Sequence, residues 1–194
     1  MKTILAKIFI LAGTLLVFTG CATTDHMTAV EGTPDLKPAA DKSMVVFMRP
    51  SSFGGAILAT VYDGMDYIGT IPANSKFAYQ TEPGEHMFMV IGESADFMKA
   101  DLAPGKTYYS RVAARMGVWK ARFSFIPYNN EEPASELQSW INDTKLMEMN
   151  EKGKAWAAQN AADITEKHDK YLPEWQSKDP NAQAKQTLFK ESGQ

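Results

Sequence analysis

The sequence predicts a mainly β protein with an α extension, in which a small antiparallel β-sandwich of about eight strands is followed by C-terminal helices. Two observations predict this fold class. From residue 43 to residue 128, short apolar or alternating runs are separated by turn signals, as in all-β sandwiches and barrels. After residue 128, apolar side chains recur at three- and four-residue spacing, the period of an amphipathic helix. We therefore divide the chain into residues 1–20, 21–42, 43–128 and 129–194.

Residues 1–20 have the composition of a signal peptide. Lys2 and Lys7 supply a positively charged start, and residues 8–18 are apolar apart from one glycine and one threonine. A helix of that length is too short to cross about 30 Å of hydrocarbon. We therefore expect this segment to be removed from the mature protein and not to form a transmembrane helix.

Cys21 is the only cysteine of the chain, and Gly20 directly precedes it at the end of the apolar run. This arrangement resembles a bacterial lipobox. The resemblance implies cleavage between Gly20 and Cys21 and a covalent lipid on Cys21, and we expect no other cofactor. Ala22 in place of an aspartate implies, by the same resemblance, an outer-membrane lipoprotein that faces the periplasm. The alternative is an ordinary signal peptide that leaves a single unpaired thiol.

The charge balance excludes one class of partner. Without residues 1–20 the chain has 18 basic and 23 acidic side chains, a formal charge of −5. Proteins that bind nucleic acid carry a basic stripe or patch and a high pI, so we expect no nucleic acid here. Because no second cysteine is present, no disulfide within the chain can form and the fold depends on its core.

Residues 21–42 differ in composition from the rest of the chain. They are rich in Thr, Ala, Pro, Asp and Lys, and Val30 and Leu36 are their only large aliphatic residues. Such a segment buries too little apolar surface to offset the entropy of ordering it. We therefore expect a flexible tether behind the lipid, with a span of roughly 25 Å.

Eight short runs predict the strands of the sandwich. The Asp63-Gly64 dipeptide lies between two of them and predicts a tight hairpin, because glycine readily adopts the positive φ that such turns require. The runs cover residues 44–48, 56–62, 67–71, 76–80, 86–91, 97–102, 107–115 and 118–126.

Four strings in this region resemble a bacterial family of uncharacterised lipoproteins, whose domain of unknown function is related to PEGA-type β-sandwiches. The resemblance covers about residues 43–128 and implies the sandwich fold and a location in the cell envelope. It implies no catalytic residue. The strings are Val45-Val46-Phe47-Met48-Arg49-Pro50-Ser51, Pro83-Gly84-Glu85-His86, Pro104-Gly105-Lys106-Thr107-Tyr108-Tyr109 and Met116-Gly117-Val118-Trp119-Lys120.

Two helices are predicted in residues 129–194. The first begins at Pro133 and continues to Met147, and the second carries Trp156 and ends near Pro173. Gly153 is expected to separate them. Residues 179–194 have only Leu188 and Phe189 as large apolar residues and are expected to fray. We expect the aromatic faces of these helices to pack on the sandwich. The alternative is a helical arm that docks onto another protein.

The last two predicted strands place basic residues on one face. If Met116-Gly117 is a two-residue hairpin loop, Arg111 lies opposite Arg122 and all the basic residues of the hairpin point outward. Like charges opposite one another are unfavourable, so we expect an acidic group nearby. The acid is either in the chain itself, at Glu131, Glu132 or Glu136, or in an anionic envelope ligand. The candidate anion-binding face consists of Arg111, Arg115, Lys120 and Arg122.

No catalytic set and no metal site is predicted. His26, His86 and His168 are scattered, and no pair has the spacing of metal ligands. Asp63 and Asp66 could be considered as calcium ligands, but carboxylates around a hairpin are typical turn residues.

The sequence therefore predicts a lipid-anchored periplasmic lipoprotein, attached to a membrane, that acts as a non-catalytic binding or scaffolding module. Its partner would be an anionic envelope ligand or an envelope protein. Two alternatives remain: a subunit of an envelope complex that docks through its C-terminal helices, and a hydrolase of envelope polymers.

Overall fold

The computed structural model describes residues 25–32, 35–116, 121–130 and 132–194. The strands are β1 (Met27–Ala29), β2 (Ser43–Arg49), β3 (Ala59–Asp63), β4 (Asp66–Ile71), β5 (Ser75–Thr81), β6 (Gly84–Ile91), β7 (Ala95–Leu102), β8 (Thr107–Met116), β9 (Ala121–Pro127), β10 (Lys145–Met149) and β11 (Thr187–Leu188). The helices are α1 (Ala134–Asp143), α2 (Glu151–Gln159), α3 (Ala161–Gln176) and α4 (Pro180–Ala184), with a 3-10 turn at Lys190–Ser192.

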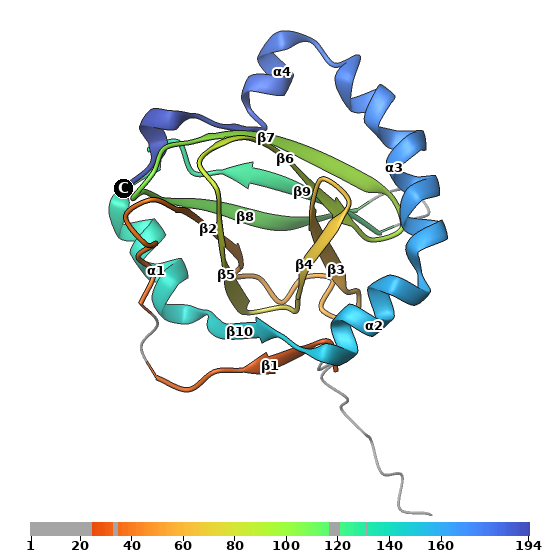
Figure 1. The fold of residues 1–194 in the computed structure, drawn as a ribbon, viewed down its shortest axis with the longest axis horizontal. Helices are drawn as coiled ribbons and strands as arrows, with labels where there is room; N and C mark the ends of the chain where they lie inside the picture. Colours follow the sequence, from red (N-terminus) through yellow and green to blue (C-terminus); the bar gives the residue numbers. More distant parts are fainter. Residues whose placement is uncertain (1–24, 33–34, 117–120, 131) are drawn as a thin grey trace, which may run out of the picture.

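Two mixed β-sheets pack on each other and confirm the predicted mainly β fold class (Figure 1). One sheet has six strands in the order β1-β10-β5-β2-β8-β9, and the other has five in the order β11-β7-β6-β3-β4. The eight predicted runs correspond to β2 through β9. The Asp63-Gly64 hairpin is confirmed as well, since Gly64 has a φ of 57° between β3 and β4.

The expectation of a purely antiparallel sandwich is wrong at three strand pairs. β2 and β8 run parallel, as do β5 and β10, and β7 and β11. Parallel neighbours cannot be joined by a tight hairpin and need a long crossover. Between β2 and β8 the chain supplies it by forming the β3–β4 and β6–β7 hairpins of the other sheet.

Strand β2 lies at the centre of the molecule and is buried on both faces. Val45 and Phe47 point into the core between the sheets, whereas Val46 and Met48 pack under α1 on the outer side. This double burial explains the continuous apolar run in the sequence. The Phe47 ring lies 5.2 Å from the Phe88 ring, a separation at which aromatic pairs contribute about 0.5–1.5 kcal/mol beyond burial.

The flexible tether predicted over residues 21–42 is wrong for the described part of that segment. Residues 27–29 form β1, which pairs with β10 in antiparallel register, and the Met27 side chain is buried in the main core. Further along, the Thr107 hydroxyl donates a hydrogen bond of 2.6 Å to the Leu36 carbonyl, and Leu36 packs beside α1. The buried Met27 side chain and the pairing of β1 with β10 hold this segment in place, although its composition predicted a flexible chain.

Helix α1 covers the outer face of the six-stranded sheet and ends earlier than predicted. Leu137 and Trp140 are buried against β2 and β8, which confirms that this helix packs on the sandwich. The prediction that the helix continues to Met147 is wrong, because Thr144 is extended and residues 145–149 form β10. The Lys76 ammonium donates to the Ile141 carbonyl at 2.7 Å and neutralises the helix C-terminus.

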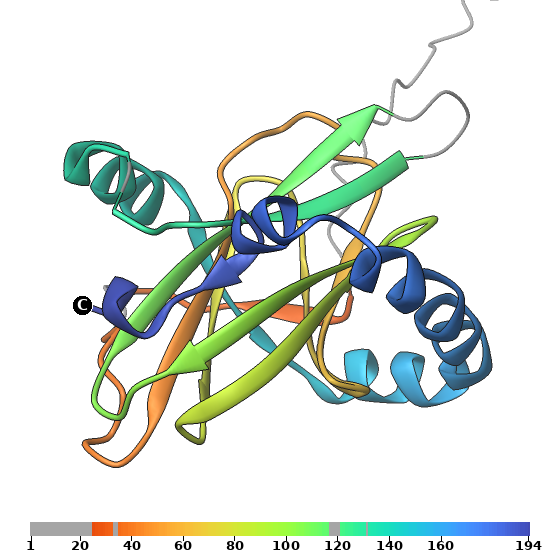
Figure 2. The same ribbon diagram turned by 90° about the horizontal axis from the view of Figure 1, so that it is seen from above.

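Helix α3 covers the outer face of the other sheet, so the two sheets lie between α1 and α3 (Figure 2). Ile164 and Trp175 are its buried residues. Gly153 was expected to separate the two predicted helices, but it lies in the first turn of α2, and β10 separates α1 from α2. A further break at Asn160 divides the second predicted helix into α2 and α3. Pro173 was expected near the helix end but lies inside α3, which continues to Gln176.

The expectation that residues 179–194 fray is wrong, because this segment is folded onto the sandwich. β11 adds to the edge of the five-stranded sheet beside β7, and Leu188 is fully buried. Gln194 and Thr107 exchange backbone hydrogen bonds, both of 2.9 Å. No helix in the described residues combines the length and the apolar character needed to cross a membrane.

Candidate functional site

The β8–β9 hairpin carries the predicted basic face, but its register differs from the prediction. Arg115, and not Arg111, lies opposite Arg122, and Arg111 lies opposite Ile126. The prediction of a two-residue loop at Met116-Gly117 was wrong, because Met116 belongs to β8 and pairs with Ala121 of β9. The observed and predicted registers differ by an even number of residues. Each side chain therefore keeps the inward or outward direction that was predicted for it.

The four predicted face residues are therefore not all brought together. Arg111 lies four residues before Arg115 on β8, close to α1. Arg115 and Arg122 form a direct cross-strand pair at the far end of the hairpin. Lys120 lies outside the described residues, as do Gly20 and Cys21.

Arg111 is neutralised within the chain. Its Nη2 lies 3.2 Å from Glu132 Oε1, and its guanidinium stacks 4.3 Å from the centroid of the Trp140 ring. The alternative in which the chain supplies its own acid is thus correct for Arg111, with Glu132 as the partner. Glu131 lies outside the described residues. The helix that covers this end of the hairpin makes Arg111 a structural residue.

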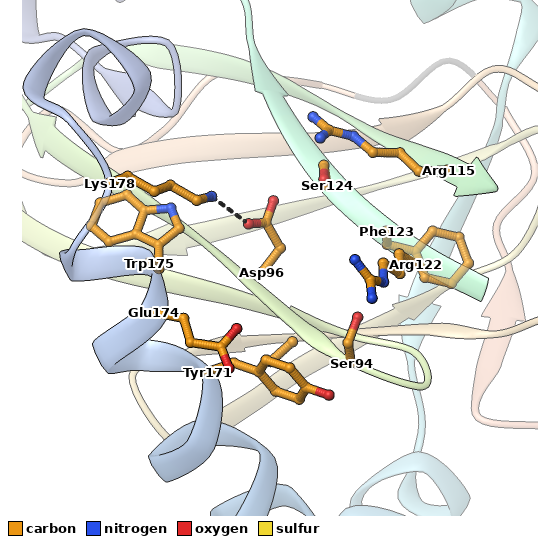
Figure 3. Close-up of a pocket in the computed structure, with 11 residues that line it drawn as sticks. Ser94, Asp96, Arg115, Arg122, Phe123, Ser124, Tyr171, Glu174, Trp175 and Lys178 are labelled. Atoms are coloured by element: carbon orange, nitrogen blue, oxygen red, sulfur yellow. Dashed lines mark hydrogen bonds and ion pairs between the residues drawn. The ribbon is translucent and has the colours of Figure 1, made fainter. Parts of the chain in front are cut away.

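Arg115 and Arg122 differ from Arg111 because both side chains are exposed and neither forms a hydrogen bond or ion pair with any described residue. Like charges directly opposite on neighbouring strands destabilise the pairing by a few tenths of a kcal/mol or more. The two guanidinium groups line a pocket of about 400 Å³ between the hairpin and α3 (Figure 3). This juxtaposition is the clearest candidate binding site in the described part of the chain.

Helix α3 and β7 form the opposite wall of the pocket. Lys178 binds Asp96 at 3.3 Å and the Gln186 side-chain oxygen at 2.7 Å, and Trp175 donates to the same Gln186 oxygen at 2.9 Å. The Gln186 amide in turn donates to Asp96. This closed network satisfies both Asp96 and Lys178 and fixes the C-terminal end of α3 against β7.

The remaining polar groups of the pocket are available to a ligand. The Glu174 carboxylate has no partner in the described residues, and the hydroxyls of Ser94 and Ser124 also line the cavity. Because Lys178 neutralises Asp96, the free charges are the two guanidinium groups and one carboxylate. Planar guanidinium groups bind oxyanions in a bidentate manner, so the pocket can hold a carboxylate or a phosphate.

The Asp63 and His86 side chains form a second polar cluster, on β3 and β6. His86 Nδ1 lies 2.8 Å from Asp63 Oδ2, the Tyr79 hydroxyl donates to the same oxygen at 3.2 Å, and His86 Nε2 lies 2.9 Å from the Glu82 carbonyl. The hydrogen bond to Asp63 raises the pKa of His86. Both ring nitrogens face acceptors, so this imidazole stabilises the sheet and has no free nitrogen for catalysis.

The structure gives no support to a metal site in the described residues, where no group of three or more His, Cys, Asp or Glu side chains has suitable geometry. Asp63, considered with Asp66 as a calcium ligand, is occupied by His86 and Tyr79. His168 lies 2.8 Å from Asp169, and its ring packs edge-on against the buried Phe97 ring at 5.9 Å.

Arg49 is a buried residue that the sequence analysis did not single out. Its guanidinium is 1 % exposed and donates to four backbone carbonyls, of Ile57 at 2.9 Å, Phe53 at 3.1 Å, Gly54 at 2.7 Å and Ile71 at 3.3 Å. Burial lowers the pKa of Arg49. Alternation along β2 could have revealed it, because Arg49 shares the inward face with Val45 and Phe47.

No protein-family model matches this chain, and a search of curated proteins finds no similar sequence. The resemblance to lipoproteins with a PEGA-like domain therefore stays a prediction from the quoted motifs.

Proposed function

We propose that this chain is a lipid-anchored lipoprotein of the bacterial cell envelope and acts as a non-catalytic module that binds an anionic group. The anchor rests on the lipobox at Gly20 and Cys21, and the binding role rests on the Arg115–Arg122 pair. The observation that carries the binding role is that these opposed guanidinium groups share a pocket and have no counter-ion in the described residues.

The composition of the pocket favours a carboxylate-bearing polymer such as peptidoglycan over the phosphates of a lipid surface. The pocket is recessed between the hairpin and α3 and also holds the free Glu174 carboxylate. A peptide carboxylate carries a single charge. The amine and amide groups near it can donate hydrogen bonds to the Glu174 carboxylate. A plane of lipid phosphates offers neither the shape nor those donors.

A binding assay tests this proposal. Purified residues 22–194 are incubated with peptidoglycan sacculi and, separately, with liposomes rich in anionic phospholipid, at low and at high salt. We expect binding to sacculi that weakens with salt, because exposed charges are screened. The Arg115→Ala/Arg122→Ala variant should lose this binding. The control Lys185→Ala/Lys190→Ala removes two exposed positive charges elsewhere and should retain it.

The outcomes separate the alternatives. Salt-sensitive binding to the liposomes alone would replace peptidoglycan by lipid phosphate as the ligand. Absence of binding to both would overturn the anion-binding role and direct attention to a protein partner. The docking-arm alternative has less support, because the aromatic residues that suggested it are packed on the two sheets.

One feature of the pocket favours the hydrolase alternative: it holds two carboxylates, the composition used to cleave glycosidic bonds. Asp96, however, is held by Lys178 and Gln186, which leaves only Glu174 without a partner. The hydrolase alternative expects release of soluble fragments from sacculi, lost in Glu174→Gln. The binding proposal expects no release by either protein.

A further inference from the structure

Strand β1 contacts the rest of the domain from its first residue, Met27, so the point at which the N-terminal chain enters the fold is fixed. Met27 is buried in the main core and pairs with Met149 of β10. Asp25 forms an ion pair of 3.3 Å with Lys152 on α2. The His26 ring lies 5.0 Å from the Trp156 ring. The chain therefore enters the domain directly beside α2.

Gly153 makes this close approach of α2 to β1 feasible. A Cβ atom at residue 153 would lie 2.5 Å from the His26 carbonyl oxygen and 3.0 Å from the Tyr67 hydroxyl. Real Cβ atoms do not come that close to backbone oxygens, so only glycine fits without a shift. The side chain of Asn150 caps the same helix start by accepting from the Gly153 amide at 3.1 Å.

The distance from this point to the proposed lipid is short. Asp25 follows Cys21 by four positions, with three residues between them, and a fully extended chain covers at most about 14 Å over four positions. A lipid on Cys21 therefore holds Asp25 within that distance of the bilayer, and Asp25 contacts Asn150 and Lys152 at the start of α2. This step rests on the proposed function, since it takes Cys21 as the anchor.

An apolar surface lies on this side of the molecule. Met65, at the β3–β4 turn, is 43 % exposed, and Met149, just before α2, is 36 % exposed. A groove of about 380 Å³ between the turn and the helices is lined by Met65 and by alanines of α2 and α3. We define the anchor-side surface by the exposed apolar residues of this groove, Met65, Ala158 and Ala161, together with Met149 where β10 meets α2.

We propose that the anchor-side surface lies on the lipid bilayer that holds the anchor. The short chain before Asp25 keeps this surface near the membrane. Burial of its exposed apolar side chains at the boundary between headgroups and acyl chains favours the contact, because binding there scales with the apolar area buried. The domain then sits on the membrane and does not float above it, in contrast to the span expected for a flexible tether.

Quenching of fluorescence by brominated lipids tests this contact. Residues 21–194 are attached through the Cys21 thiol to a maleimide lipid in vesicles that contain phospholipid brominated on the acyl chains. Two variants each add one tryptophan at an exposed large apolar position, Met65→Trp on the anchor-side surface and Phe189→Trp just after β11. β4 and β11 form opposite edges of the five-stranded sheet.

We expect the fluorescence added by Met65→Trp to be quenched and that added by Phe189→Trp to be unchanged. Insertion of twenty Gly and Ser residues between Thr23 and Thr24 should abolish the difference. Equal quenching at both positions, quenching at Phe189→Trp alone, or no quenching at either would overturn the proposal. So would quenching that the longer chain leaves undiminished.

The attachment in this experiment is chemical, so its result does not depend on lipidation in cells. Failure of the proposed anchor would appear separately, as a lack of acylated Cys21 in the mature protein by mass spectrometry.

Discussion

The four arginines of this chain form two pairs that face different surroundings. Arg49 and Arg111 have partners for their Nη groups within the chain, Arg49 in backbone carbonyls and Arg111 in Glu132, with Trp140 stacked on its guanidinium. Arg115 and Arg122 lie opposite each other near the turn of the β8–β9 hairpin, which also carries Arg111, and they have no partner in the described residues. The comparison shows that the outward position of a basic residue on a strand does not indicate a binding role. What decides the role is whether another element covers it.

The largest effect is expected at Arg49. Arg49→Met keeps much of the apolar stem but removes the donors to four carbonyls, of which the Ile71 oxygen is buried with it. We expect a loss of about 3 kcal/mol in the free energy of unfolding. Urea denaturation of residues 22–194 measures it. A loss below about 1 kcal/mol would mean that water replaces the guanidinium at this loop.

A smaller loss is expected at Arg111. Arg111→Ala removes a partly exposed ion pair and a cation–π contact, which together are worth about 1–2 kcal/mol. A double-mutant cycle with Glu132→Ala separates the ion pair from the stacking on Trp140. If the two single substitutions add without coupling, the ion pair contributes nothing and the stacking alone holds Arg111.

The free energy of unfolding should depend on pH through His86, a third cationic group that has partners within the chain. Its pKa is raised in the folded protein by Asp63, so the folded state binds the proton more tightly than the unfolded chain does. The stabilisation is complete below the unfolded pKa of about 6.5, and it is lost as the pH rises through the folded pKa. Denaturation from pH 5 to pH 9 should show this decline, and His86→Gln should flatten it. An unchanged slope in His86→Gln would assign the decline to another group.

The smallest effect is expected at the unpaired arginines. Arg115→Glu replaces a like-charge pair by an opposite-charge pair across the strands, which should raise the free energy of unfolding by about 0.5 kcal/mol. Thermal unfolding at low salt is the appropriate measurement, because salt screens exposed pairs. A destabilisation would indicate that Arg115 has a partner within the chain.

The sequence predicts the parts of this fold that depend on a local period. The alternation from Val112 to Arg115 placed the correct side chains inward and outward, although the register was wrong. The register depends on where along the chain the hairpin turns, and no periodic signal encodes that position. Pairings of short strands are equally hidden, because β1, β10 and β11 are defined by the neighbours they meet in the folded chain.

Only the hairpin side of the candidate site could be predicted, because the other side is formed by elements distant in the sequence. Arg115 and Arg122 were identified from the strand pattern, but the opposite wall comes from α3 and β7, and nothing in the sequence brings Glu174 or Lys178 to the hairpin. The acid beside Arg111 was foreseen because Glu132 follows β9 closely in the chain. The buried Lys76 gave no signal, since its acceptors belong to α1, about 65 residues away in sequence.

The most direct test compares the two kinds of arginine in one assay of binding to peptidoglycan sacculi. The account predicts that Arg115→Ala/Arg122→Ala loses salt-sensitive binding while its free energy of unfolding stays within about 0.5 kcal/mol of the parent. Arg111→Ala should lose stability and keep its binding. Loss of binding in Arg111→Ala, with full binding retained in Arg115→Ala/Arg122→Ala, would contradict the account.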